Sequence, residues 1–259
     1  MFDAHCHLDL CHENPQEVLL RARNAGVRDL LIAGVQADGW GAQNALAGTG
    51  VHVAWGIHPW RIAAAPQAWE QEWAALESIL EKPPTAVVAL GETGLDYGRR
   101  IDPGSHALQK EAFRKQLQLA KHYDLPVVLH IVRAHQDAIK ILKEEGVPQA
   151  GGLVHSFGGN DVQAKQYVDL NLHISFSGSV VNPKRTRVRN AATTVPNNRI
   201  LVETDSPDQT PETRKPLPNE PAFLLDVIAT IAQLRGCSAT RLAKTTSDNA
   251  HALLGTHPS

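Results

Sequence analysis

The chain has 259 residues, of which 42% are hydrophobic and 20% are charged, and its formal net charge at pH 7 is −2. A chain of this length can bury a sizeable core, and its composition is ordinary for a globular protein. The near-neutral charge excludes a global basic field that would attract nucleic acid, so any such partner would need a local basic patch.

The cysteine pattern and the hydropathy of the chain bear on its location. The three cysteines, Cys6, Cys11 and Cys237, show neither disulfide spacing nor zinc-knuckle spacing, which fits a reducing cytosol. No apolar run approaches the roughly 18 residues of a transmembrane helix. Met1 runs directly into an apolar strand pattern, which leaves no room for a signal peptide. We therefore expect a cytoplasmic protein without membrane contact and without an evident obligate protein partner.

Apolar runs of β type alternate with helical patterns along the whole chain. Stretches such as residues 86–90 (A-V-V-A-L) are apolar throughout, which is typical of strands buried on both faces of a parallel sheet. The strands that we predict are residues 1–7, 29–34, 51–57, 86–92, 126–131, 152–155, 172–177 and 200–205. The helices that we predict are residues 15–25, 66–80, 104–123, 134–145, 161–170, 185–194, 222–235 and 238–254.

This order of elements predicts an α/β fold, a (β/α)₈ TIM-like barrel. Alternation alone would also allow an open doubly wound sheet, but the number of strands and the polar residues at their ends favour the barrel. No linker rich in Gly, Ser or Pro divides the chain, so we expect residues 1–259 to form a single domain. The Pro-rich segment 207–221 should form an ordered loop over the end of the last strand.

The first seven residues, M-F-D-A-H-C-H, contain a His-x-His pair. Successive side chains of a strand point to opposite faces, so Asp3, His5 and His7 would share one face. Two imidazoles at this spacing can hold one divalent ion such as Zn, Mn, Fe or Ni, and a nearby carboxylate would complete the site. The alternative is a pair of half-buried strand residues with no ligand role.

Further histidine and acidic residues follow the later apolar runs. The residues at the strand ends are His5, His7, His58, Glu92, His130, His155, Glu203 and Asp205. Barrel enzymes place their chemistry at the C-terminal ends of the strands. Burying so many polar groups without partners would cost several kcal/mol each, and metal ions are the natural partners. A glutamate placed between two ions can bridge them.

Six short motifs contain or adjoin these residues. They are residues 3–9 (D-A-H-C-H-L-D), 56–59 (G-I-H-P), 91–97 (G-E-T-G-L-D-Y), 125–130 (L-P-V-V-L-H), 154–159 (V-H-S-F-G-G) and 203–207 (E-T-D-S-P). In this order, and over essentially the whole chain, they resemble the TatD family of metal-dependent hydrolases and deoxyribonucleases, within the wider amidohydrolase-like barrels. The resemblance implies two divalent metal ions, Mg, Mn or Zn. It places one ion on His5, His7, Glu92 and Asp205 and the other on Glu92, His130 and His155, with Glu92 as the bridge.

The chain departs from the family pattern at two places. The family often has a second histidine after G-x-H-P, where this chain has Trp60. It also often has a basic R-G-K stretch before N-E-P, where residues 213–218 here read T-R-K-P-L-P. Both changes fall on the expected substrate rim, so they bear on substrate identity more than on metal binding.

Other residues have two interpretations each. Asp96 either supports a metal ligand from behind or caps an Asx-turn. Glu203 is interpreted as such a support for its neighbours. Residues 184–189 (K-R-T-R-V-R) place four cations after the seventh strand, where barrels often bind phosphate, or they form a solvated helix face. We take His58, Arg133, Lys184 and Arg185 as candidate substrate contacts, and Trp60 is able to stack on substrate.

The leading hypothesis is a two-metal hydrolase that cleaves a phosphodiester, with DNA as the expected substrate. Asp205 would take or orient the proton of the attacking water, and Glu92 would hold both ions. The first alternative is an amide, lactone or ester hydrolase on the same barrel. The second is a barrel that binds metal or nucleic acid without turnover. The basic segment favours phosphate, and the complete set of ligands argues against an inactive binder.

Overall fold

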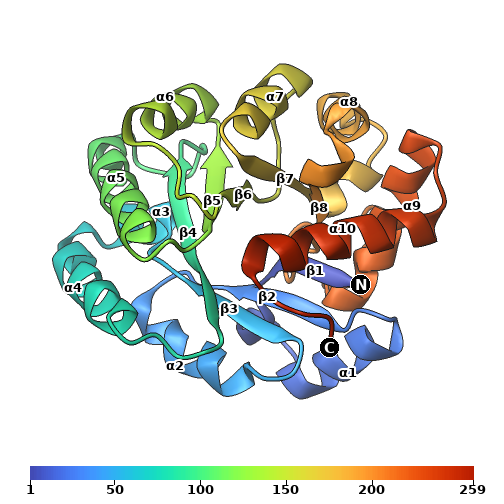
Figure 1. Ribbon diagram of the computed structural model, residues 1–259, viewed down its shortest axis with the longest axis horizontal. Coiled ribbons are helices and arrows are strands. Elements are labelled where there is room, and N and C mark those ends of the chain that lie inside the picture. The colour runs from blue at the N-terminus through green and yellow to red at the C-terminus, as the bar shows by residue number, and fades with distance from the viewer.

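The computed structural model describes residues 1–259 and contains one sheet of eight parallel strands that follow one another in chain order. The strands are β1 Phe2–Cys6, β2 Asp29–Ala33, β3 Val51–Trp55, β4 Val87–Asp96, β5 Val127–Val132, β6 Gly152–Val154, β7 Leu172–Phe176 and β8 Ile200–Val202. The sheet curls into a nearly closed barrel with the helices arranged around it (Figure 1). The prediction of a (β/α)₈ barrel is therefore confirmed.

The outer layer consists of ten α-helices and several short 3₁₀ turns. The helices are α1 Pro15–Asn24, α2 Ala37–Leu46, α3 Pro59–Ala64, α4 Trp69–Leu80, α5 His106–His122, α6 His135–Glu145, α7 Asp161–Asp169, α8 Thr186–Thr194, α9 Leu224–Arg235 and α10 Ala239–Leu254. The sequence patterns missed α2 and α3. Gly39 and Gly41 weaken the helical pattern of α2, and α3 is only six residues long.

Backbone hydrogen bonds between the first strand and the segment after β8 bring the two ends of the sheet together. His7 N–H donates to the carbonyl of Ser206 (2.7 Å), and Asp205 N–H donates to the carbonyl of His5 (3.0 Å). The Asp3 carboxylate accepts the backbone N–H of Thr204 at 2.8 Å. These bonds place the first candidate residues of the chain beside the last ones.

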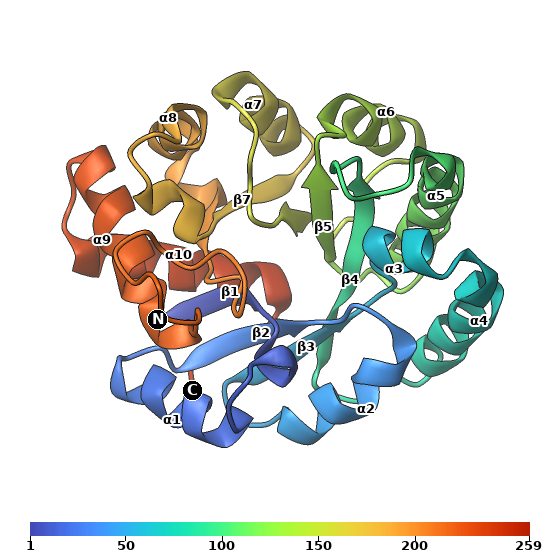
Figure 2. The same ribbon diagram turned by 180° about the vertical axis from the view of Figure 1, so that it is seen from behind.

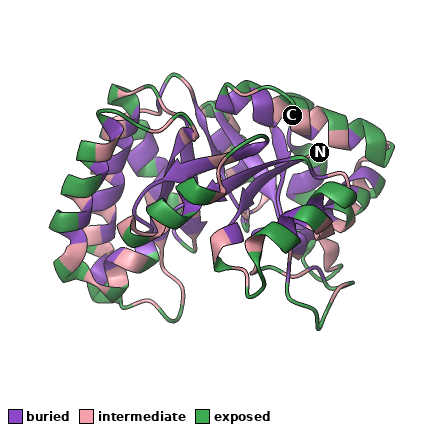
Figure 3. Ribbon diagram, turned by 90° about the horizontal axis from the view of Figure 1, so that it is seen from below, coloured by how far each residue is buried: buried purple, intermediate pink, exposed green.

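The core has an inner and an outer part. The inner part fills the barrel with residues from seven strands, and Ala250, Leu253 and Leu254 of α10 pack against them. Helix α10 therefore closes one end of the barrel, on the face seen in Figure 1. The outer part lies between the strands and the surrounding helices, whose outward sides are exposed (Figure 3). No single helix is long and apolar enough to cross a membrane; α9 and α10 pass that test only as a pair, bent by 109°.

The expected alternation of side chains along β1 is wrong for its first half. Phe2 and Ala4 belong to the inner core, whereas Cys6 belongs to the outer core. The pairing of β1 with β2 shifts register between Asp3 and Cys6, and such an irregularity changes the face to which the following residues point. Asp3 consequently binds Thr204 instead of sharing a face with His5 and His7.

Two strands end elsewhere than predicted. Strand β4 continues past Glu92 to Asp96, so Glu92 lies within the strand rather than at its end. Strand β8 stops at Val202, so Glu203 and Asp205 belong to the loop that follows and do not project from one strand face. In β4, Gly94 has a φ of +135° and passes so close to β5 that a Cβ would collide with the carbonyl oxygen of His130. This contact brings the Glu92 segment and His130 together.

Candidate functional site

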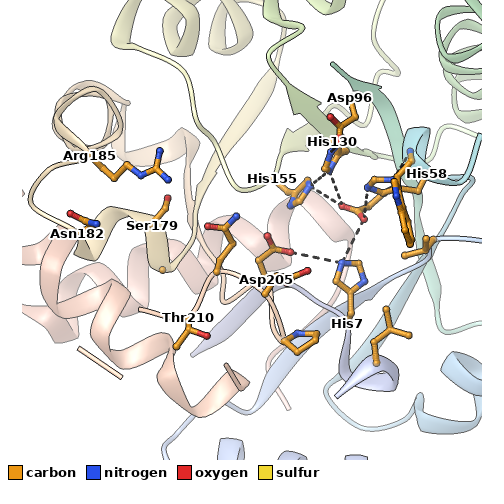
Figure 4. A pocket seen from close by; sticks show the side chains of 18 of the residues that line it. His7, His58, Asp96, His130, His155, Ser179, Asn182, Arg185, Asp205 and Thr210 are labelled. Carbon is orange, nitrogen blue, oxygen red and sulfur yellow. Dashed lines mark hydrogen bonds and ion pairs between the residues drawn. The ribbon is translucent and has the colours of Figure 1, made fainter. Parts of the chain in front are cut away.

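A cavity of about 620 Å³ opens at the C-terminal ends of the strands, at the opposite end of the barrel from α10. This end of the barrel faces the viewer in Figure 2. Six of the eight residues predicted at strand ends line it; they are His7, His58, Glu92, His130, His155 and Asp205. His5 and Glu203 are fully buried beneath them. The structure therefore brings all eight residues to one place, and Figure 4 shows the side chains that line the cavity, among them His7, His58, His130, His155 and Asp205.

A first group of ligand atoms forms where β1 meets the loop after β8. The Nε2 atoms of His5 and His7 lie 3.4 Å apart. Glu92 Oε2 lies 3.1 Å from His5 Nε2, and Asp205 Oδ1 lies 3.6 Å from the same atom. Ligands held about 2.0–2.2 Å from a tetrahedral zinc ion are separated by about 3.3–3.6 Å. The spacing of these four side chains is therefore that of a divalent metal site.

A second group lies on the other side of Glu92. His155 Nε2 is 2.8 Å from Glu92 Oε2 and 3.0 Å from His130 Nδ1. The far nitrogen of the His130 ring, Nε2, lies 3.0 Å from Asp96 Oδ2. A carboxylate that accepts the proton of one ring nitrogen leaves the other free as a metal ligand, and this pairing is common behind metal-bound histidines. Asp96 is placed to orient His130 in this way.

Hydrogen bonds to the backbone fix the protonation of two further rings. The carbonyl of Ala33 accepts from His7 Nδ1 (3.0 Å), so the unprotonated Nε2 of His7 faces the first group. In His58 the roles of the two ring nitrogens are reversed, because Nδ1 accepts the backbone N–H of Trp60 (2.9 Å). The neutral His58 ring then carries its proton on Nε2, 3.5 Å from Glu92 Oε1. His7 thus presents a free nitrogen to the first group, whereas His58 presents a hydrogen-bond donor to the cavity.

Glu203 supports the site from below. It is fully buried, and its Oε1 accepts the backbone N–H of Ser156 (2.5 Å) and lies 3.4 Å from His155 Nδ1. It therefore faces the ring nitrogen of His155 that points away from Glu92. Asp205 itself has a φ of +57°, an uncommon backbone conformation for a residue with a side chain. Such conformations cluster at functional sites, and this one turns the Asp205 carboxylate toward His5 and His7.

Three buried carboxylates, those of Glu92, Glu203 and Asp205, share this site without any ion pair to lysine or arginine. Burial opposes ionisation of Glu92, but the neighbouring His155, His5 and His58 outweigh it and hold the pKa of Glu92 well below its usual range. Burial lowers the pKa of His155, yet Glu92 and Glu203 raise it well above the ordinary value. Burial raises the pKa of Asp205 to about 7. Such a site needs added positive charge, and divalent cations supply it.

Buried polar atoms without hydrogen-bond partners also bear on whether metal ions fit this site. His5 Nδ1 and Glu203 Oε2 have no hydrogen-bond partner, and neither is exposed. The donor set contains imidazole nitrogens, which suit Zn, and carboxylate oxygens, which suit Mn or Mg, and it contains no thiolates. The site contains four groups of three side chains, and within each group the three ligand atoms lie within 4.8 Å of one another. Each group joins distant parts of the chain, and two of the groups also contain His58 or Glu203. The residues therefore fit divalent metal ions, with His5, His7, Glu92, His130, His155 and Asp205 as the side chains that could hold them.

The residues predicted for substrate contact divide into two sets. Arg185 lines the cavity on the side opposite His58 and Asp96, together with Ser179 and Asn182 (Figure 4). Arg133 and Lys184 are exposed and do not line it. A substrate contact of these two residues therefore stays a prediction, because sequence position alone cannot show which way an exposed side chain turns. Trp69 and Trp73 pack against each other with ring centroids 5.5 Å apart, as expected for core residues.

Comparisons with known proteins also indicate a metal-dependent hydrolase. Residues 2–255 match the family model described as TatD related DNase. The chain is 34% identical over 256 residues to the uncharacterized metal-dependent hydrolase YcfH of Escherichia coli K12, covering 96% of this chain and 93% of that protein. It is 34% identical over 247 residues to the 3'-5' ssDNA/RNA exonuclease TatD of Pantoea vagans, covering 92% of each chain.

A solved structure shows the same architecture. The crystal structure of YjjV, a TatD homolog from E. coli K12, superposes with a TM-score of 0.92 at 31% sequence identity. The match covers 99% of this chain and 98% of that chain. The resemblance seen in the six sequence motifs is thereby confirmed across the whole fold.

Two buried glutamines of α5, which the sequence analysis did not single out, hold the backbone on either side of the site. The Gln109 amide accepts from Asp96 N–H (2.8 Å) and donates to the Asp96 carbonyl (3.2 Å). The Gln116 amide pairs in the same way with Ile57, at 2.8 and 3.0 Å. Ile57 precedes His58, so the two glutamines, one above the other on α5, fix the positions of His58 and Asp96. Their spacing of seven residues, on a face that is otherwise apolar, is the signal that could have found them.

We predict that Gln109→Leu weakens metal binding. The substitution keeps the side-chain volume but leaves the N–H and carbonyl of Asp96 without their partner, so Asp96 loses its fixed position behind His130. The free energy of unfolding should fall by about 1–3 kcal/mol, and metal affinity should fall by roughly 10–100-fold. Denaturant titration and calorimetric metal titration measure the two effects.

The matched control is Gln118→Leu on the same helix, where the glutamine is exposed. It should change the free energy of unfolding by no more than about 0.5 kcal/mol and leave metal affinity as it is. A Gln109→Leu protein that binds metal as tightly as the unaltered protein would contradict the positioning role.

Proposed function

Because the chain belongs to the TatD family of metal-dependent hydrolases, we propose that its cavity hydrolyses phosphodiester bonds of nucleic acid with two divalent metal ions. One observation carries the proposal: ligand atoms from β1, β4, β5 and the loops after β6 and β8 converge around the buried Glu92. A cytoplasmic location is part of the proposal and rests on the cysteine pattern of the sequence alone.

The two groups of ligand atoms suggest how the ions would be held. His5, His7 and Asp205 would hold one ion, and His130 and His155 the other. Glu92 Oε2 lies near both groups, 3.1 Å from His5 Nε2 and 2.8 Å from His155 Nε2, and Glu92 Oε1 lies 3.6 Å from His7 Nε2. This position supports a bridging role for Glu92. The nitrogen and oxygen donors are compatible with Mg, Mn or Zn.

The proposed mechanism assigns separate tasks to the surrounding side chains. Bound metal ions would supply the Lewis acidity that lowers the pKa of water toward 7 and polarises a phosphoryl oxygen. Asp205, whose carboxylate lines the cavity, would accept the proton of the attacking water. His58, with its proton on Nε2, would donate a hydrogen bond to an oxygen of the substrate. Glu203 would hold His155 in place, and Asp96 would do the same for His130.

Nucleic acid is the substrate class that the cavity supports best. The relative from P. vagans is named as an exonuclease for single-stranded DNA and RNA. In this chain the guanidinium of Arg185 lines the cavity without a hydrogen-bond or ion-pair partner, beside Ser179 and Asn182. An unpaired cation at the edge of a metal site is suited to a neighbouring phosphate of a polyanionic substrate. Arg189 has a structural task instead, because its Nη1 donates to the carbonyl of Val180.

Metal removal provides the first test. Chelation should abolish hydrolysis of single-stranded DNA, RNA or a small phosphodiester, and added Mg²⁺, Mn²⁺ or Zn²⁺ should restore it. Glu92→Ala should lower the number of ions that remain bound per chain, because both groups of ligands lose a shared oxygen donor. Elemental analysis measures the metal content; full occupancy in Glu92→Ala would refute the bridge. Turnover of amides or lactones but of no phosphodiester would favour the alternative hydrolase.

The second test separates the two acids after β8. Asp205→Asn retains the shape and one coordinating oxygen but removes the basic charge, so kcat should fall by roughly 10²–10⁴-fold while at least one ion stays bound. Glu203→Gln acts through the orientation of His155, and kcat should fall by roughly 10–100-fold. Both are measured at saturating metal. The assignment is wrong if Glu203→Gln is the inactive protein and Asp205→Asn is nearly normal.

The third test concerns the basic segment after β7. Arg185→Gln should weaken binding of a single-stranded oligonucleotide and reduce the slope of log K against log salt by about 0.7 for the lost phosphate contact. Arg187→Gln is the matched control, because Arg187 is exposed on α8 and does not line the cavity. Equal salt slopes in the two variants would mean that the whole segment is a solvated surface.

A further inference from the structure

The mouth of the cavity has an apolar side that the metal chemistry does not use. Only three of the 20 lining residues are hydrophobic, and they are Leu10, Val35 and Trp60. They follow β1, β2 and β3, which are consecutive strands of the sheet. The three side chains therefore come from one sector of the barrel mouth and not from scattered positions.

Trp60 is unusually exposed for so large an apolar side chain. Its exposed fraction is 55%, and that of Leu10 is 53%. Trp40, Trp55 and Trp69 are buried, and Trp73 is half-buried against Trp69. A single exposed hydrophobic residue is common, but these two lie at the same cavity. An aromatic face in a concave polar site is suited to a flat ligand ring.

The backbone of Trp60 is held firmly beside the site. Its N–H donates to His58 Nδ1, and Pro59 fixes the first turn of α3. His58 lies in turn next to Glu92, and Gln116 holds the preceding residue, Ile57. The base of the indole side chain is thus anchored to the framework that places the ligand atoms. A side chain on a fixed backbone loses less conformational freedom on binding a ligand than one on a mobile segment.

The opposite side of the mouth is polar and cationic. Ser179, Asn182 and Arg185 follow β7, which lies four strands away from β3 in the eight-stranded barrel. Figure 4 shows these three residues across the cavity from His58, with Asp205 between them. A ligand that fills the cavity would therefore meet an aromatic ring at one end, the carboxylate and histidine cluster in the middle, and a guanidinium at the other end.

We propose that Trp60, on the apolar side of the mouth that also contains Leu10, stacks on the nucleobase adjacent to the phosphate being cleaved, while Arg185 receives the next phosphate of the strand. The inference rests on the proposed phosphodiesterase function and specifies its substrate as a base-bearing strand. Every nucleobase has a π-face, so the platform tolerates any base. A base stacked inside the cavity cannot keep a pairing partner, so the platform selects unpaired ends. In this chain Trp60 is then a specificity-determining residue.

A binding measurement without turnover tests the platform directly. The metal-loaded protein is titrated by calorimetry with the 3′- and 5′-monophosphates of adenosine and, separately, with ribose 5-phosphate. The nucleotide of the preferred polarity should bind about 5- to 100-fold more tightly than the sugar phosphate, the range that base–aromatic stacking covers. Trp60→Ala should remove this preference, and Trp60→Phe should keep most of it. Trp73→Phe, which alters a tryptophan outside the cavity, should bind as the unaltered protein does.

Equal affinity of the unaltered protein for the nucleotides and the sugar phosphate would overturn the platform, as would a preference that survives in Trp60→Ala. Tryptophan fluorescence offers a second readout, because Trp60 is the exposed tryptophan of the five. Nucleotide binding should quench it in the unaltered protein and leave Trp60→Phe unquenched. Quenching that persists in Trp60→Phe would place the base elsewhere.

A kinetic comparison distinguishes failure of this inference from failure of the proposed function. A dinucleotide and its abasic counterpart present the same phosphodiester, with and without bases. If the metal-loaded protein cleaves neither these nor a single-stranded oligonucleotide, the phosphodiesterase proposal fails, and the binding data alone judge the platform. If it cleaves both with equal kcat/KM, the hydrolase proposal stands and the platform is refuted. The expected result is a lower KM for the dinucleotide; Trp60→Ala should remove that difference, and Trp73→Phe should keep it.

Discussion

A glutamate carboxylate that is only 1% exposed lies at the centre of the site, and keeping it ionised there determines the arrangement of the molecule around it. An ionised carboxylate in so buried a position is costly unless positive or hydrogen-bonding groups surround it. Histidines from the first strand, from β5 and from the loops after β3 and β6 provide those groups for Glu92. His5 and Asp205, which are 200 positions apart in the chain, come within 3.6 Å of each other beside Glu92 because β1 and the loop after β8 bond to each other. Closure of the barrel and assembly of the site therefore depend on the same backbone hydrogen bonds.

The strands were predictable because strands buried on both faces are apolar over their whole length, and that pattern is visible locally. The ends of the strands were less predictable. Strand β4 runs on to Asp96, where Gly94 lets it pass close to β5, and β8 stops at Val202 because its continuation turns to bond to β1. Both outcomes depend on a neighbouring strand and not on the local pattern. Helix α2 escaped notice since its glycines oppose a helix that only packing against the sheet stabilises.

The site was predictable from the sequence to a similar extent as the strands. Residues with metal-ligand chemistry stood at successive strand ends, so their convergence followed from the fold. The roles of individual atoms could not be inferred from the sequence. Whether His7 or His58 presents a free nitrogen depends on Ala33 and Trp60, a carbonyl in one case and an N–H in the other. Likewise, four cations after β7 looked equivalent in the sequence, yet Arg185 reaches the cavity while Arg189 binds the carbonyl of Val180. Such differences arise from the direction of single side chains in three dimensions.

The metal-ligand side chains and the walls of the cavity come from different parts of each βα unit. Most of the former lie on strands or directly after them, whereas Leu10, Trp60, Asn182 and Arg185 lie farther along in the loops. Loops tolerate replacement better than the elements that they connect. A lineage can therefore exchange one wall by mutation while inheriting the hydrolytic machinery unaltered. Trp60 lies on such a wall and is largely exposed, so replacing it would change which substrate the cavity accepts while the metal-ligand residues stay the same.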